Sequence, residues 1–219
     1  DRLLGLVDAL NGRINELAER GEALAGLKGD IRVLREAVLG VLEPPFGAIE
    51  GTHWIETLND GSPVLIRPLR PEDRQRETDF INRLSEQACR FRFLGNLKEA
   101  SPALLDQLMN VDYQDRMAFV ALAHDNGELR EVGVSRYSAS GDEKQCECAV
   151  TVADDWRHRG LGVLLMRRLI DIARKNGFRR MFSIDVAENE PMHELADYLG
   201  FKRRLDPDDA AQAIHTLDL

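Results

Sequence analysis

The sequence has few cysteines, no long apolar run and no excess of positive charge. No stretch approaches the roughly 20 apolar residues that span a bilayer, and the first residues do not resemble a secretory leader. Lys and Arg number 29 against 38 Asp and Glu, which gives a net charge of -9 and a pI near 5.1. These absences argue against partners such as a membrane or a nucleic acid. We expect a cytoplasmic protein.

Three cysteines and five histidines offer little material for a metal site. Cys146 and Cys148 lie two residues apart, so an extended strand would place both thiols on one face, where we interpret them as small buried side chains. The histidines lack the spacing of a metal motif on one helix, and we predict no metal. They are His53, His124, His158, His193 and His215.

The first 46 residues predict a helical segment separate from the rest of the chain. Leu3, Val7 and Leu10 begin an apolar stripe with alternating spacings of four and three, and a second stripe follows Asp30. The run Glu43–Gly47 contains two prolines and cannot continue a helix. We expect a hairpin or coiled-coil-like segment over residues 1–46, with a role in homo-oligomerisation or regulation.

Residues 50–219 predict one mixed α/β domain, because strand-like and helix-like patterns alternate. The elements that flank the motif below are a strand over Gln145–Val152 and a helix over Gly160–Lys175. Other expected strands are His53–Leu58, Val64–Leu69, Met117–Ala123, Leu129–Ser138, Arg180–Val186 and a final pair. Other expected helices begin at Pro71, Ser85, Ser101 and Pro191.

The segment Val150–Gly162 leads from a strand through a glycine-bearing loop into a helix, which is typical of an anion site. The first helical turn has unpaired backbone N–H groups and a positive partial charge. Gly160 and Gly162 would let a phosphate approach the backbone, and Arg157 and Arg159 add charge. The pattern is neither a Walker loop nor a dinucleotide fingerprint, and the glycines alone could serve a turn or close packing.

The run Arg157–Gly162, Arg-His-Arg-Gly-Leu-Gly, resembles the Arg/Gln-x-x-Gly-x-Gly/Ala signature of the GNAT superfamily of N-acetyltransferases. Asn189–Met192 and Leu199–Lys202 resemble the closing part of the same fold. The resemblance covers roughly residues 50–219. It implies a splayed central sheet flanked by helices, and acetyl-CoA as the co-substrate.

A narrower resemblance concerns the acceptor. Ile66–Asp73, Arg92–Phe93 and Glu147–Val150 look like bacterial protein lysine acetyltransferases that modify acyl-CoA synthetases. The resemblance implies transfer of an acetyl group to a protein lysine, with an acyl-CoA synthetase as the possible partner. The segment before residue 50 resembles neither a cyclic-nucleotide module nor a synthetase-like domain.

The family likeness also implies roles for individual residues. Glu147 alternates with the two cysteines, so its side chain faces the other side of the sheet, and it matches the general base of the family. Ala196 stands where many relatives have a tyrosine that protonates the leaving thiolate, and Tyr198 lies on a different helical face, so no general acid is assigned. The residues expected to bind acetyl-CoA are Val150, Thr151, Val152, Arg157, His158, Arg159, Gly160, Leu161, Gly162, Val163 and Asn189.

Two alternatives remain open at this point. The acceptor could be a small amine, because the side chains of the segments that would contact it do not identify a substrate. The chain could instead be a non-catalytic acyl-CoA sensor, although a sensor would need no base at Glu147.

Overall fold

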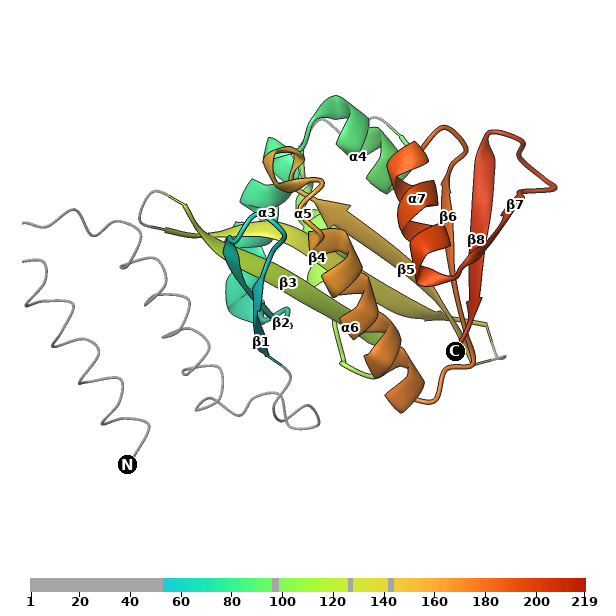
Figure 1. The fold of residues 1–219 in the computed structure, drawn as a ribbon, viewed down its shortest axis with the longest axis horizontal. Helices are drawn as coiled ribbons and strands as arrows, with labels where there is room; N and C mark the ends of the chain where they lie inside the picture. Colours follow the sequence, from blue (N-terminus) through green and yellow to red (C-terminus); the bar gives the residue numbers. More distant parts are fainter. Residues whose placement is uncertain (1–52, 96–98, 126–127, 142–143) are drawn as a thin grey trace, which may run out of the picture.

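The computed structural model describes residues 53–95, 99–125, 128–141 and 144–219, which form an eight-stranded sheet with helices on both faces (Figure 1). The strand order is β1-β2-β3-β4-β5-β6-β8-β7, and only β5 and β6 pair in parallel. The predicted helical segment 1–46, with its proposed self-association, lies outside the described residues. The strands are β1 Trp54–Thr57, β2 Pro63–Pro68, β3 Arg116–Asp125, β4 Glu128–Ser140, β5 Gln145–Val152, β6 Arg180–Val186, β7 Lys202–Leu205 and β8 Gln212–Asp218.

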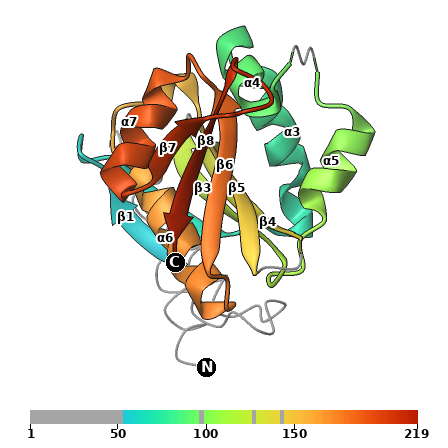
Figure 2. The same ribbon diagram turned by 90° about the vertical axis from the view of Figure 1, so that its right-hand side faces the viewer.

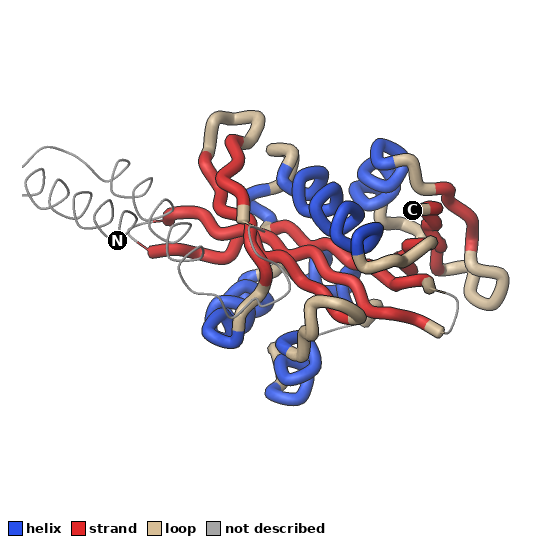
Figure 3. The backbone as a smooth tube through the Cα atoms, turned by 90° about the horizontal axis from the view of Figure 1, so that it is seen from below, coloured by secondary structure: helices blue, strands red, loops and turns tan. Residues whose placement is uncertain are grey.

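The helices divide between the two faces of the sheet. One group covers one face and the other group covers the opposite face, as Figure 2 shows along the sheet and Figure 3 shows from below. The first group is α3 Arg74–Arg83, α4 Glu86–Phe93 and α5 Pro102–Met109, and the second is α6 Leu161–Lys175 and α7 Glu190–Leu199. The predicted mixed α/β order is therefore confirmed.

Local sequence signals explain several of these boundaries. Ser85 and Ser101 cap α4 and α5, each accepting a hydrogen bond from a backbone N–H three residues later. Gly61 has a φ of 85° in the turn between β1 and β2, where a residue with a side chain would be strained. The helix expected at Pro71 begins instead as a short 3-10 turn, with α3 following from Arg74.

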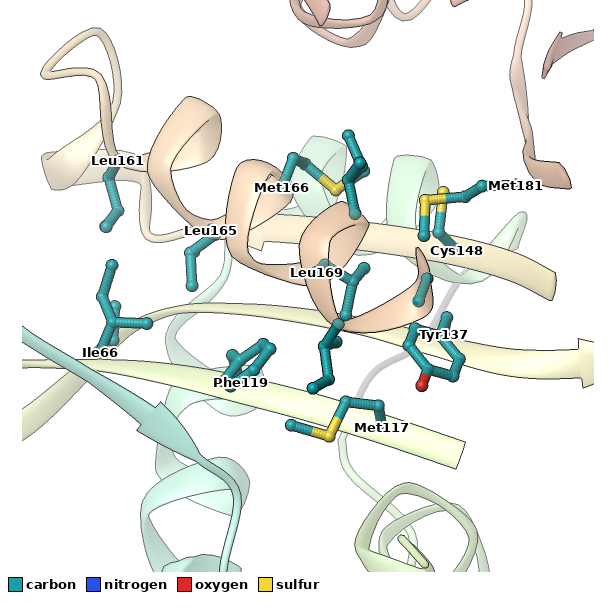
Figure 4. Packing of buried hydrophobic residues seen from close by; sticks show 14 of the residues in the cluster. Ile66, Met117, Phe119, Tyr137, Cys148, Leu161, Leu165, Met166, Leu169 and Met181 are labelled. Atoms are coloured by element: carbon teal, nitrogen blue, oxygen red, sulfur yellow. The ribbon is translucent and has the colours of Figure 1, made fainter. Parts of the chain in front are cut away.

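The face under α6 is an apolar core (Figure 4). Leu161, Leu165 and Leu169 point from α6 toward the strands and are at most 1% exposed. The helix lies so close to β4 that a Cβ added at Gly133 would come within 3.0 Å of the Leu165 side chain. Cys146 and Cys148 belong to this core as free buried thiols, which confirms their predicted burial on one face.

The face under α3, α4 and α5 contains charge as well as apolar side chains. Asp73 is fully buried and forms a two-armed ion pair with Arg67, at 2.7 and 2.8 Å. The Asp73 carboxylate lies in the first turn after Arg70 and neutralises a buried guanidinium. This ion pair and its backbone hydrogen bond from Arg70 fix the turn between β2 and α3.

None of the helices within the described ranges is long and apolar enough to cross a membrane.

Candidate active site

The two parallel strands at the centre of the sheet separate from one another. β5 and β6 pair only between Gln145–Glu147 and Arg180–Phe182. Beyond this point each strand continues against its other neighbour, β5 against β4 and β6 against β8. A wedge therefore opens between β5 and β6, and the backbone groups of β5 that face it are not used in a β5–β6 ladder. This is the splayed sheet that the sequence predicted.

A cavity of about 400 Å³ occupies the wedge. Its walls come from α4, β5, the loop before α6, the first turn of α6, β6 and α7. The cavity lining includes Glu147 and every predicted cofactor-binding residue except Arg159. The structure thus brings together residues from 147 to 189 that the sequence had assigned to one site.

The start of α6 forms the narrow end of this cavity. Gly160 has a φ of 88°, and a Cβ there would lie 3.1 Å from the side chain of Asn59, whose backbone N–H donates to the carbonyl of Arg159. A Cβ at Gly162 would meet Leu195 of α7 at 3.4 Å. Both glycines line the cavity, but only at Gly160 is the space beside the Cα atom taken by a protein neighbour, since 3.4 Å at Gly162 is an ordinary contact. Their backbone N–H groups remain suited to an anion, as expected at a helix N-terminus.

The two arginines of the motif have different environments. Arg157 lines the cavity and forms an ion pair with Asp154 at 2.8 Å. Arg159 turns away: its guanidinium pairs with Asp60 at 2.8 Å and stacks over Trp156 at 4.7 Å. These two contacts hold the Arg159 guanidinium outside the cavity lining, and its expected part in cofactor binding stays a prediction.

Glu147 lies on the α4 side of the sheet and is exposed to solvent. Its neighbours Cys146 and Cys148 point into the core under α6, as the alternation along β5 predicted. Arg92 of α4 lines the same cavity. Burial and the nearby Arg136 lower the pKa of Arg92 to about 10, while Glu147 raises it, so Arg92 remains cationic at neutral pH.

Helix α4 is held at both sides of the wedge. At its start, the backbone N–H and the hydroxyl of Ser85 donate to the carboxylate of Asp154, at 2.9 and 2.8 Å. In its last turn, Arg90 forms an ion pair with Glu188 in the loop after β6 at 3.2 Å. These contacts position Arg92 over the wedge from the side on which Glu147 is exposed.

Helix α7 closes the opposite side. Asn189 caps it by accepting a hydrogen bond from the N–H of Met192 and also lines the cavity, so both of its expected roles are structurally compatible. Ala196 is fully buried in the core. Tyr198 points to a different side of the helix, as expected, and lies at the exposed edge of the cavity, where its hydroxyl accepts a hydrogen bond from Arg167 at 3.3 Å.

The sequence missed Asp185 of β6, which lines the cavity and contacts His215. His215 in turn contacts His193, although the two histidines had been treated as scattered. Polar residues at Ser183 and Asp185, two apart on a strand beside an apolar core, were the available signal. Among the described residues, no group of His, Cys, Asp and Glu is arranged to hold a metal ion.

Comparison with known proteins identifies the family of this chain. The family described as Acetyltransferase (GNAT) family matches residues 81–201. The chain belongs to the GNAT family. An acetyltransferase of Pseudomonas aeruginosa is 63% identical over 174 residues, which cover 80% of this chain and 94% of that protein. The protein is therefore an acetyltransferase that uses acetyl-CoA.

More distant relatives share the fold. Acetyltransferase Pat of Mycolicibacterium smegmatis is 26% identical over 78% of this chain, which corresponds to 48% of the longer relative. The GNAT domain of S. lividans PAT superposes with a TM-score of 0.69 at 21% identity, covering 76% of this chain and 97% of that domain. The Salmonella typhimurium protein YncA, solved with its cofactor acetyl-CoA, superposes with a TM-score of 0.57 at 20% identity, over 71% and 94% of the two chains.

Proposed function

We propose that this GNAT enzyme transfers the acetyl group of acetyl-CoA to a lysine side chain of a protein, with Glu147 as the general base. The observation that carries the proposal is the position of Glu147. Glu147 is an exposed carboxylate at the end of β5 that still pairs with β6. This end of the wedge lies away from the start of α6. A donor bound from the α6 side and an amine arriving from the α4 side would meet beside it.

The chain offers suitable groups for acetyl-CoA along the wedge. The pyrophosphate would lie on the backbone N–H groups from His158 to Val163, with Arg157 adding positive charge. The pantetheine arm would pair with the free backbone edge of β5 at Val150 and Val152. Thr151 would contribute through its backbone alone, because its hydroxyl is buried away from the cavity surface.

The chemistry of the acceptor requires a base. A lysine amine has an ordinary pKa near 10.4, so at neutral pH it arrives as an ammonium ion and must lose a proton before it attacks the thioester. The exposed Glu147 is accessible to such an amine, either directly or through a water molecule. A carboxylate at the acceptor side also attracts the ammonium ion before the transfer.

A protein acceptor is favoured by two findings. The runs Ile66–Asp73 and Glu147–Val150 resemble lysine acetyltransferases that act on acyl-CoA synthetases, and the match to Acetyltransferase Pat extends over 171 residues. Glu147 also stands on an open face that a folded partner can approach. An acyl-CoA synthetase is therefore the first partner to test.

The test incubates the full chain with radiolabelled acetyl-CoA and purified acyl-CoA synthetases, beside a panel of small amines. We expect label on a synthetase lysine, and we expect Glu147→Gln to reduce the rate about 100- to 10,000-fold while the protein still binds acetyl-CoA. Glu128→Gln, which changes an exposed carboxylate at the far end of β4, is the matched control and should retain the full rate.

Other outcomes would contradict the proposal in different ways. Label on small amines alone would overturn the lysine acceptor. A Glu147→Gln rate within a few-fold of the wild type would overturn the role of Glu147. Binding of acetyl-CoA without transfer to any acceptor would favour the sensor alternative.

A further inference from the structure

A continuous line of hydrogen bonds runs from the core into the wedge. His193 Nε2 lies 2.9 Å from the carbonyl oxygen of Ala187, and His193 Nδ1 lies 3.0 Å from His215 Nε2. His215 Nδ1 lies 3.1 Å from Asp185 Oδ2, which also accepts a hydrogen bond from the Ser183 hydroxyl at 2.6 Å. His215, Ser183 and His193 are at most 3% exposed.

The distances determine how many protons this line contains. The carbonyl of Ala187 can only accept, so His193 Nε2 carries a proton. Each of the two remaining contacts, between the histidines and between His215 and Asp185, also needs one proton. Without it two lone pairs would face each other in a buried site, at the cost of an unmade hydrogen bond. With every contact made, and with the Ser183 hydroxyl donating to Asp185 and not to His215 Nδ1 3.4 Å away, the line would hold three protons, one more than two neutral imidazoles and a carboxylate provide.

An additional proton would have three possible places. It can rest on Asp185, on His215 or on His193, and each arrangement leaves the group without net charge. The arrangements differ only by the shift of a proton along a contact of 3.0 or 3.1 Å. The line can therefore deliver a proton at Asp185 and refill that position from the histidines behind it.

Asp185 is where this line reaches the wedge. Its side chain is 14% exposed, while His215 is fully buried, and it lines the acetyl-CoA cavity. Glu147 pairs with Phe182 at the last rung between β5 and β6, and Asp185 lies three residues further along β6, on the wall of the wedge opposite β5. It also points to the side of the sheet that α7 covers.

Two ionisable groups beside Asp185 do not compete with this line for a proton at neutral pH. Arg92 and the thiol of Cys148 lie close enough to interact with Asp185. Arg92 has a pKa of about 10, and burial raises the pKa of Cys148 well above its usual range. Neither group exchanges a proton at neutral pH.

We propose that Asp185 is the general acid of the transfer, supplied with its proton by His215 and His193. Asp185 would protonate the leaving thiolate. Many relatives use a tyrosine for this at the position of Ala196, which here is buried and has no group that can donate a proton. The amine nitrogen bonds to the acetyl carbon, the carbon–sulfur bond breaks with its electron pair on sulfur, and the sulfur takes the proton of Asp185. The nitrogen loses two protons through Glu147: the first leaves to solvent before the attack, and the second is held by Glu147 and then released to solvent. Solvent returns one proton to the histidines, so the products are an amide, the CoA thiol and one proton in solution.

The role of Asp185 as general acid depends on acetyl transfer from acetyl-CoA, and it does not depend on which amine is the acceptor. The assay therefore follows CoA thiol release with whichever amine the wild type acetylates. We expect Asp185→Asn to lower kcat about 100-fold with little change in the Kd of acetyl-CoA. The alkaline fall of kcat, which reports loss of the additional proton, should disappear in the variant. Asp197→Asn, an exposed change on α7, is the control and should behave as the wild type.

A structural role would give a different result. A kcat within two-fold of the wild type, or a loss equal at every pH with the alkaline fall retained, would overturn the proposal. Nitrogen NMR of the histidines in the wild type provides a second test that needs no variant and no acceptor. It should find a proton on His193 Nε2 and one in each of the two contacts, and an unprotonated contact near pH 7 would also overturn it.

Discussion

The two faces of the sheet bury different kinds of side chain. Under α6 the buried residues are almost all apolar, and the helix contributes leucines spaced by one turn. Under α3 and α5 the core contains buried charged groups, among them Glu77 and Glu131, with the partly buried Arg136 beside them. The apolar core under α6 packs beneath the wedge. The charged groups of the other face lie near Arg92, on the side from which the acceptor would approach.

Two buried acids of the charged face, Glu77 and Glu131, lie near the same cation, Arg136. Arg136 pairs with Glu77 at 2.6 Å and donates to the carbonyl of Leu108 at 2.9 Å. Glu131 is fully buried, and neither of its carboxylate oxygens has a hydrogen-bond partner within the described part of the chain. Burial, followed by the charge of Glu77, raises the pKa of Glu131 well above its usual value.

The largest loss of stability from a change on the charged face should come from Arg136→Met. Removal of the guanidinium leaves Glu77 buried without its partner, and we expect a loss of about 3–5 kcal/mol in the free energy of unfolding. Urea denaturation measures the loss. The double variant with Glu77→Met should recover most of it, because both charges are then absent. A double variant as unstable as the single one would show that the arginine acts by packing alone.

A smaller effect, visible through its pH dependence, should come from Glu131→Gln. A raised native pKa means that the native state keeps the proton which the unfolded chain releases above pH 4.5. The stability of the wild type therefore falls as the pH rises from 4.5 toward the native pKa, by at most about 1.4 kcal/mol per pH unit. Glutamine cannot ionise, so the variant should gain stability relative to the wild type at pH 8 and not at pH 4.5.

Thermal unfolding at several pH values measures that difference. Glu128→Gln, on the exposed end of the same strand, should show no such pH dependence. Equal stability differences for Glu131→Gln at pH 4.5 and pH 8 would contradict the buried protonated acid.

Local patterns in the sequence predicted much of this fold. The strand Gln145–Val152 has the predicted bounds, and the helix predicted from Gly160 begins at Leu161 because Gly160 itself caps it in a left-handed conformation. These features depend on alternation, helical spacing and capping, which neighbouring residues determine. The alternation along β5 also placed Glu147 on the correct face.

Contacts between distant residues could not be predicted in the same way. Asp185 and His215 are 30 residues apart, and they meet only because β6 pairs with β8. Arg159 carries the right charge at the right place in the motif, but Asp60 from the β1–β2 turn pairs with it. Such partners depend on the tertiary arrangement, which spacing along the chain does not specify.

Hydrogen exchange of the full chain with and without acetyl-CoA tests the central claim most directly, because it locates the donor without any acceptor. The account predicts that acetyl-CoA protects the backbone N–H groups of β5 from Cys148 to Val152 and those from His158 to Val163. Strand β7, which contributes no residue to the cavity lining, should exchange unchanged. Protection elsewhere, with β5 and the start of α6 unaffected, would contradict the assignment of the wedge as the acetyl-CoA site.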